Sequence, residues 1–127
     1  MISGIGIDVV QVSRMRHWVD DPGLLERYFH PLEIRTAMER GEAAVLSLAA
    51  RFAAKEAFGK ALGTGLRGIS LKEIRISNNN LGKPDVALTG TALEAFRRAG
   101  GHRILCSLTH EVDNAIALIV IEGNPDE

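Results

Sequence analysis

Arg51-Phe-Ala-Ala-Lys-Glu-Ala-Phe-Gly-Lys60, followed directly by Ala61-Leu-Gly-Thr-Gly65, is the stretch that decides the fold of this chain. It predicts most of a long helix, from about Glu42 to Leu62, that ends at two glycines. The helix carries two lysines, an arginine and one carboxylate among residues that are otherwise small or apolar. This pattern is typical of a helix that helps to hold a metal ion and phosphates.

Helical geometry makes Glu56 and Lys60 neighbours. At about 100° per residue the two side chains lie roughly 40° apart, at the edge of an apolar face. The alternative is an ordinary ion pair on a solvated face. Arg51 and Lys55 are expected on the exposed flank as a like-charged pair, which an anionic ligand would relieve. The inner face consists of Leu46, Ala50, Ala53, Ala54, Ala57 and Ala61.

The composition is that of an ordinary water-soluble domain. A chain of 127 residues with 46% hydrophobic and 24% charged residues can form one core, so a single domain spanning 1–127 is expected. The net charge of −1 gives no overall reason to bind nucleic acid or a membrane. Cys106 is the single cysteine and lies in an apolar run, so an inert buried thiol in a reducing cytoplasm is expected. The N-terminal segment Met1–Asp8 is too short and too soon interrupted by an acid to be a signal peptide or a membrane span.

The remaining elements predict an α+β fold, with helices in the first half and a mainly antiparallel sheet built from the second half and the N-terminal strand. No internal repeat, Walker A sequence or dinucleotide-binding fingerprint is present. The predicted strands are Ile2–Val12, Leu71–Ser77, Val86–Leu88, Ile104–Thr109 and Ala115–Ile121; the other predicted helices are Ser13–Val19, a piece from Leu24, Pro31 to about Arg40, and Thr89–Ala99; the segment 123–127 is expected to be a frayed tail.

Two further groups of polar residues are candidates for chemistry. Asp8 interrupts a β-branched run and, with Glu56, supplies hard oxygen ligands that suit a magnesium ion, although a strand-end cap is an equally good interpretation of Asp8 alone. Ser107 and Thr109 share one face of a strand that ends at His110, where hydroxyls and an imidazole could receive a phosphate. The alternative for these residues is a strand that runs into a polar turn.

Taken together and in this order, several motifs closely resemble the holo-acyl-carrier-protein synthase family, the short 4′-phosphopantetheinyl transferases. The resemblance runs from Gly4 to about Glu122, and its motifs are Ile5-Gly-Ile-Asp8, the Arg51–Gly65 block, Gly82-Lys-Pro84, and Ser107-Leu-Thr-His110 with Ala115 and Ala117. It implies a single-lobe transferase fold, with the long helix packed on the sheet. It also implies an enzyme that moves the phosphopantetheine arm of coenzyme A to a serine of an apo acyl carrier protein and releases adenosine 3′,5′-bisphosphate.

The resemblance also implies roles for individual residues. Asp8 and Glu56 would be the ligands of a catalytic Mg²⁺, and Lys60 would contact the diphosphate and stabilise the leaving phosphate. Arg51 would hold a coenzyme A phosphate, and His110 would approach the 3′-phosphate. Ser107 and Thr109 would help there, while Gly63, Gly65 and Pro84 would form walls of the adenine and pantetheine sites. The acceptor of the serine proton is open between Glu56, acting through a water, and a hydroxide on the metal.

The partners follow from the same resemblance. Arg14, Met15, Arg16 and Trp18 are predicted to offer positive charge beside exposed apolar surface to an acidic carrier protein, although solubilising arginines are an equally good interpretation of Arg14 and Arg16. A one-lobe chain must borrow its second wall, so a homotrimer with sites between subunits is expected. The carrier could serve fatty-acid or secondary metabolism.

Three departures from the family pattern and two rival functions accompany this hypothesis. Thr109 replaces a usual serine and keeps the hydroxyl, so little effect is expected there. Gln11 stands where many relatives carry an acid, and His30 replaces a frequent threonine shortly before Glu33. The rivals are a binding module that kept the fold and lost catalysis, and a purely structural subunit. The joint presence of Asp8, Glu56 and Lys60 argues against the first rival, and the like-charged Arg51–Lys55 pair against the second.

Overall fold

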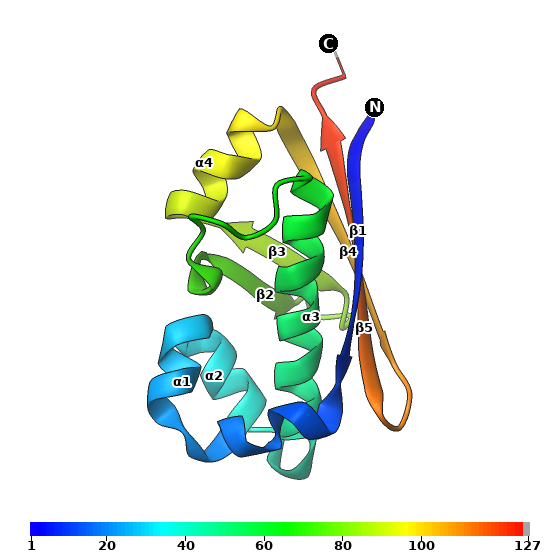
Figure 1. Ribbon diagram of the computed structural model, residues 1–127. Helices are drawn as coiled ribbons and strands as arrows, with labels where there is room; N and C mark the ends of the chain where they lie inside the picture. The colour runs from blue at the N-terminus through cyan, green and yellow to red at the C-terminus, as the bar shows by residue number, and fades with distance from the viewer. Residues whose placement is uncertain (126–127) are drawn as a thin grey trace.

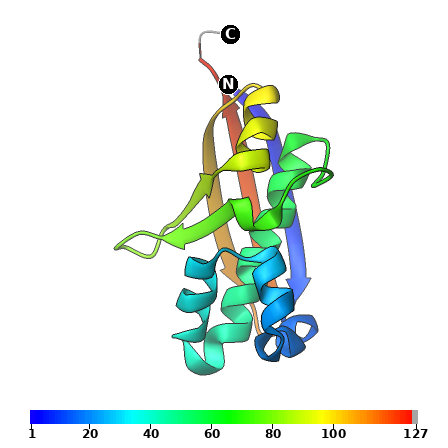
Figure 2. The same ribbon diagram turned by 90° about the vertical axis from the view of Figure 1, so that its left-hand side faces the viewer.

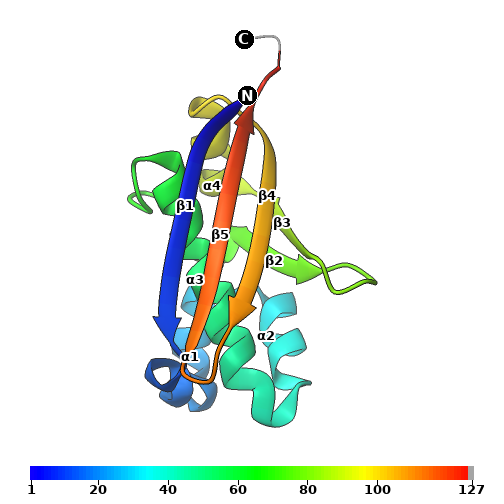
Figure 3. The same cartoon turned by 90° about the vertical axis from the view of Figure 1, so that its right-hand side faces the viewer.

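The computed structural model describes residues 1–125 and places one long helix, α3 (Ala44–Leu62), across a three-stranded antiparallel sheet (Figure 1). The sheet has the order β1-β5-β4, with β1 at Ile2–Gln11, β5 at Asn114–Gly123 and β4 at Gly101–His110. Helix α3 covers one face of this sheet. The other face carries no helix or strand from residues 1–125 (Figure 3).

A second layer lies on the side of α3 away from the sheet, as Figure 2 shows. It contains a two-stranded hairpin whose turn projects from the body, together with the short helices. Its elements are the 3₁₀ helix η1 (Val12–Asp20), α1 (Pro22–Tyr28), α2 (Pro31–Met38), the 3₁₀ turns η2 (Gly41–Ala43) and η3 (Leu71–Glu73), the hairpin strands β2 (Ile74–Asn78) and β3 (Pro84–Leu88), and α4 (Gly90–Arg98). No helix within residues 1–125 has the length and apolar character that a membrane crossing requires.

Close contact between β1 and α3 explains the alanine-rich face of the helix. Ala53, Ala54 and Ala57 are fully buried, and β1 presents glycines to them. A Cβ atom on Gly6 would lie 2.0 Å from the carbonyl oxygen of Ala57, and one on Gly4 would lie 1.9 Å from that of Ala61. The two backbones therefore approach to a distance that only glycine permits.

The α+β class, the long helix and its packing on an antiparallel sheet are confirmed, and most predicted elements are present with shifted ends. The predicted strand from Leu71 is shorter, because residues 71–73 form a 3₁₀ turn before β2. The hairpin β2–β3 forms a separate sheet instead of joining the larger one. Ser13 lies inside η1, and Gln11 occupies its N-cap. β5 continues to Gly123, whose N–H donates to the carbonyl of Met1, while residues 126–127 of the expected tail lie outside the described part of the chain.

The prediction that Arg51 and Lys55 occupy an exposed flank of the helix is wrong. Arg51 is 3% exposed and Lys55 is fully buried, because α2 and β2 cover this side of α3. Burial lowers the pKa of Lys55 to about 8, although its partner Glu33 acts in the opposite direction. Cys106 is half-buried rather than fully enclosed, and burial raises its pKa to about 11, so its thiol is protonated at neutral pH.

The departure at His30 has a local explanation. His30 is the N-cap of α2, and its Nδ1 accepts a hydrogen bond from the N–H of Leu32 at 3.0 Å. Glu33 completes a capping box, because its Oε1 accepts from the N–H of His30 at 2.9 Å. The imidazole thus supplies the acceptor that a threonine hydroxyl would supply, and the helix geometry is kept.

Candidate active site

Strand β1 delivers Asp8 to the surface of α3. Gly4, Gly6 and Asp8 lie on the same face of the strand, since successive side chains alternate, and this face is turned toward the helix. The side chain of Asp8 is 17% exposed. The glycine contact described above brings the strand close enough for this short side chain to reach the polar edge of α3.

Lys60 is bound to Asp8 and not to Glu56. Its Nζ lies 2.9 Å from Asp8 Oδ1 and donates a second hydrogen bond, at 3.0 Å, to the carbonyl of Ile7. The lysine side chain remains 55% exposed. Lys60 therefore does not form the simple surface ion pair with Glu56 that was the alternative interpretation.

Glu56 lies in an electrostatic setting that suits a cation. Its pKa is raised, first by burial and then by the nearby carboxylate of Asp8, while Lys60 and Arg14 oppose the shift. Two carboxylates that repel each other gain when a divalent ion comes between them, and their oxygens are the ligands that Mg²⁺ prefers. No cluster of three or more metal-ligating side chains occurs within residues 1–125. The residues present fit Mg²⁺ with Asp8 and Glu56 as the protein ligands, since this ion usually keeps waters and takes phosphate oxygens for the rest.

A hollow of about 540 Å³ opens beside Glu56, between η1, α1 and α3. Its walls include a cluster of three aromatic rings: Trp18 lies 5.4 Å from both Tyr28 and Phe52, measured between ring centroids. The guanidinium of Arg14 lies 5.9 Å above the ring of Phe52. The complete lining is Arg14, His17, Trp18, Leu24, Tyr28, Phe52, Glu56, Leu66 and Leu71.

The predicted carrier-docking residues divide into two groups. Arg14 and Arg16 are exposed, as a charged docking surface requires. Met15 is fully buried and Trp18 is 8% exposed, so the prediction of exposed apolar surface at these two positions is wrong. The physical reason is the 3₁₀ period: residues three apart share a face, and in η1 that face packs against α3.

Arg51 lies in a second hollow, of about 180 Å³, that shares no residue with the first. Its Nη1 donates to Ser47 Oγ at 2.6 Å and its Nη2 to Asn78 Oδ1 at 3.4 Å, while Nε has no partner. Burial lowers the pKa of Arg51. The negative charge of Glu33 opposes this shift, and the positive charge of Arg40 adds to it. A buried guanidinium with a free N–H and no carboxylate bonded to it can accept an anion such as a phosphate.

Two of the three β4 residues that were predicted to bind a phosphate line the second hollow together with Arg51. Thr109 and His110 line it, together with Arg40, whereas Ser107 is exposed further along the strand and lies outside the lining. Pro84, the first residue of β3, pairs with Asn78 and so adjoins the same region. Arg40 and Asn78 were missed by sequence reasoning, because neither belongs to a recognisable motif.

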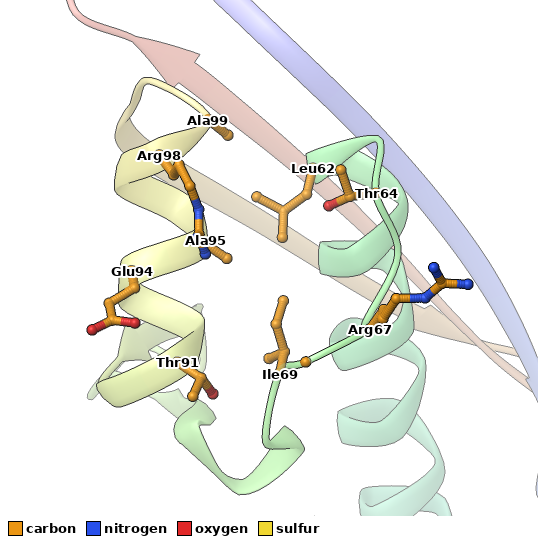
Figure 4. A pocket seen from close by; sticks show the side chains of 10 residues that line it. Leu62, Thr64, Arg67, Ile69, Thr91, Glu94, Ala95, Arg98 and Ala99 are labelled. Atoms are coloured by element: carbon orange, nitrogen blue, oxygen red, sulfur yellow. The ribbon is translucent and has the colours of Figure 1, made fainter.

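The glycines after α3 lie at the Lys60 end of the helix. Gly63 ends α3 with φ of 83°, its N–H bonded to the carbonyl of Lys60, and Gly65 N–H donates to the carbonyl of Gly59. Thr64 between them lines a third hollow, of about 450 Å³, where Leu62 and Ile69 point into the gap before α4 (Figure 4). The predicted ligand residues thus form two groups, with Asp8, Glu56, Lys60 and the two glycines in one and Arg51, Pro84, Thr109 and His110 in the other.

The chain is similar to known proteins over most of its length. The family model described as 4′-phosphopantetheinyl transferase superfamily matches residues 4–117. Holo-[acyl-carrier-protein] synthase of Treponema denticola is 53% identical, with 97% of this chain and 100% of the relative covered.

Solved structures give the same result. Holo-[acyl-carrier-protein] synthase from Neisseria meningitidis superposes with a TM-score of 0.85 at 37% identity, covering 96% of this chain and 99% of that chain. The enzyme from Bacillus anthracis in complex with CoA (3′,5′-ADP) superposes with a TM-score of 0.81 at 32% identity, covering 98% and 99%. The chain therefore belongs to the holo-[acyl-carrier-protein] synthase family of the 4′-phosphopantetheinyl transferase superfamily and is an enzyme of that class.

Proposed function

We propose that this enzyme transfers the 4′-phosphopantetheine group from coenzyme A to a serine of an apo acyl carrier protein, with Mg²⁺ as cofactor and adenosine 3′,5′-bisphosphate as the second product. The observation that carries the proposal is the arrangement of Asp8, Glu56 and Lys60, in which a cation and two carboxylates converge beside an aromatic hollow. The curated relatives carry the corresponding name, and solved relatives bind coenzyme A or its 3′,5′-ADP part.

In this proposal, different residues of the chain have different roles in the reaction. The serine hydroxyl attacks the phosphorus that carries the pantetheine, a new P–O bond forms, and the bond to the bisphosphate breaks. Bound Mg²⁺, held by Asp8 and Glu56, would neutralise charge on the diphosphate. Lys60, which is half-exposed at the edge of the site, would stabilise the leaving phosphate. We assign the serine proton to Glu56, acting through one water, because this carboxylate lines the hollow beside the Asp8–Lys60 pair.

The second hollow suits the far end of coenzyme A. Arg51 offers an unpartnered Nε–H, and Thr109 and His110 add donors. A 3′-phosphate bound here would satisfy the buried guanidinium and offset the cost of its burial. Ser107, which lies outside the hollow, has no part in this proposal.

We further propose that the active enzyme is a trimer whose sites lie between subunits. Ile5, Ile7 and Val9 are 64, 57 and 55% exposed on the open face of the sheet, and their partners on β5 are Val120, Leu118 and Ile116. Such a continuous apolar face is typical of an interface between copies. The Lys60 group and the Arg51 group share no hollow within one chain, so a neighbouring copy would complete each site. A cytoplasmic location is part of this proposal.

The direct test is to incubate the protein with coenzyme A, Mg²⁺ and a panel of apo acyl carrier proteins from fatty-acid and secondary metabolism. Intact-mass spectrometry should detect the phosphopantetheine adduct on the serine, and chromatography should detect adenosine 3′,5′-bisphosphate in equal amount. The adduct should disappear with EDTA and return with added Mg²⁺. Absence of an adduct on every carrier would refute the proposal and favour a binding module without catalysis.

A further inference from the structure

Lys55 is a fully buried cation that lines neither the first nor the second hollow, yet it is bonded to three separate segments of the chain. Its Nζ donates to Glu33 Oε1 at 2.8 Å, to the carbonyl of Leu71 at 2.9 Å, and to the carbonyl of Ile74. It also lies 5.4 Å from the centroid of the Phe29 ring. One side chain of α3 therefore binds α2, the turn η3 and the start of β2 at once.

Glu33 extends this connection along β2. Its Oε2 accepts a hydrogen bond from the N–H of Ile76 at 3.0 Å, so Ile74 and Ile76 are both bonded to the Glu33–Lys55 pair. Two consecutive inward residues of the strand are thus fixed relative to α3. A slip of β2 by one residue would break these bonds.

β2 ends at Asn78, which contacts Arg51 in the second hollow. The amide of Asn78 accepts from Arg51 Nη2 at 3.4 Å and donates to the carbonyl of Gly82 at 3.0 Å, where the hairpin turns. Arg51 and Lys55 lie one helical turn apart on α3. The same helix therefore holds β2 at its start through Lys55 and at its end through Arg51.

We propose that the Glu33–Lys55 pair is a positioning device for phosphate recognition: it fixes β2 against α3 so that Asn78 orients the Arg51 guanidinium toward the 3′-phosphate of coenzyme A. This inference rests on the proposed function of the second hollow. Lys55 is absent from the lining of that hollow and acts through β2. A buried ion pair is often no more stabilising than well-packed apolar residues of similar volume, so fold stability alone does not account for its presence.

The test compares ligands with and without the 3′-phosphate. The double variant Lys55→Met with Glu33→Gln removes both charges of the pair, so neither is left without the other, and the amide can still accept from Ile76. Calorimetry would measure the affinity for adenosine 3′,5′-bisphosphate and for adenosine 5′-monophosphate, and kinetics would measure kcat/KM for coenzyme A and for dephospho-coenzyme A. In the double variant, the ratio of the affinity for adenosine 3′,5′-bisphosphate to that for the monophosphate should fall about tenfold, which corresponds to one charge-assisted hydrogen bond. The affinity for the monophosphate itself should be unchanged.

Matched variants separate positioning from general damage. Arg51→Gln should lose the same preference, and Lys72→Met, which removes an exposed lysine from the turn that Lys55 holds, should keep it. Asn78→Ala breaks the link at the exposed end of β2 without touching the buried pair, and it should also reduce the preference even if the double variant folds poorly.

The outcomes distinguish this inference from the function on which it rests. If wild-type protein shows no preference for the 3′-phosphate, the assignment of the second hollow fails, and the inference fails with it. If wild type shows the preference but the double variant and Asn78→Ala both retain it, only the positioning role is overturned. Equal losses for both ligands would also overturn it, since they indicate general disruption of the site.

Discussion

Lys60 Nζ lies 2.9 Å from Asp8 Oδ1, which joins the last turn of α3 to the middle of β1 across the exposed edge of the candidate site. The lysine is half-exposed, and Asp8 is bordered by Glu56 on the same helix. A charge at this position contributes little to folding, because water screens it. We therefore expect Lys60 to matter for the proposed reaction more than for folding, and the first prediction depends on this difference.

Lys60→Met should impair catalysis and leave stability almost unchanged. Loss of one preorganised cation at a developing negative charge lowers kcat by about 10²–10³-fold. Loss of an exposed ion pair changes the free energy of unfolding by about 1 kcal/mol at most. Steady-state kinetics and a urea titration of the same preparation measure the two effects. An unchanged kcat would show that Lys60 has no role in the chemical step.

Glu56→Gln should stabilise the metal-free protein at neutral pH. Burial and Asp8 raise the pKa of Glu56 in the folded state, so the folded protein binds this proton more tightly than the unfolded chain does. The resulting stability is present below the unfolded pKa, about 4.3, and is lost as pH rises through the folded pKa. The variant avoids this loss, so its Tm should exceed that of wild type at pH 7 and match it near pH 4.

Added Mg²⁺ provides the control for this prediction. It should raise the Tm of wild type, because the ion binds the folded state alone, and leave the Tm of Glu56→Gln unchanged. Equal responses of both proteins to Mg²⁺ would contradict the ligand assignment of Glu56. Calorimetric scans with EDTA and with Mg²⁺ make this comparison.

Gly6→Ala should be strongly destabilising. The new Cβ would lie 2.0 Å from the Ala57 carbonyl oxygen, a backbone atom that cannot rotate away. Overpacking of this kind costs about 3 kcal/mol, which corresponds to a fall in Tm of roughly 10 °C. In the matched variant Gly23→Ala, the nearest atom to the new Cβ is Asp21 Oδ1 at an ordinary 3.7 Å, so the Tm should be unchanged or slightly raised. Similar Tm values for the two variants would show that β1 can move away from α3.

Arg14→Glu should weaken binding of the carrier protein more than binding of coenzyme A. Arg14 is exposed at the rim of the aromatic hollow, where it can attract an acidic carrier. Reversal of one interfacial charge should raise KM for the carrier about tenfold at low salt, and the effect should shrink as salt screens it. Arg97→Glu makes the same charge change on α4, at the opposite end of the molecule (Figure 1), and should leave KM unaltered. A similar effect of both variants would indicate net charge alone.

Ile7→Lys should dissociate the proposed trimer. Ile7 lies in the middle of the exposed apolar face, opposite Leu118, and a lysine there cannot be buried between copies without a large desolvation cost. Sedimentation should show monomers that are folded and inactive. Leu32→Lys, which changes a 42% exposed leucine on α2, is the control and should keep the wild-type mass. A monomeric wild type with full activity would contradict the proposal of shared sites.

The sequence predicted the helices and strands better than it predicted which of their side chains are buried. Glycines, prolines and apolar periodicity located α2, α3, the hairpin and the last two strands within a few residues. The helix period alone placed Lys55 on an exposed flank, because the partner that buries it, Glu33, lies 22 residues away in sequence. Burial of a charge in this protein is a tertiary property, and no local pattern indicates it.

Part of the candidate site could be predicted from the sequence. A single motif holds Glu56 and Lys60, and Asp8 stood out as a carboxylate within a β-branched run, whereas spacing alone could not show that Asp8 and Lys60 meet. One physical signal was present in the sequence: Gly4 and Gly6 stand at the two alternate positions before Asp8, as a strand packed on a helix of alanines requires. Met15 and Trp18 were misplaced because their burial comes from the packing of η1 against α3, a tertiary contact that the local sequence does not indicate.

The close backbone contact that Gly4 and Gly6 allow between β1 and α3 also has an evolutionary consequence. Core side chains can drift by compensating substitutions, and such drift usually shifts neighbouring elements by small amounts. Between Gly6 and Ala57 the separation is that of two peptide backbones, which no substitution can reduce. The spacing between the carboxylate on the strand and the charges on the helix is therefore insulated from sequence change elsewhere in the core, so relatives can diverge widely there while the distances needed for phosphoryl transfer stay constant.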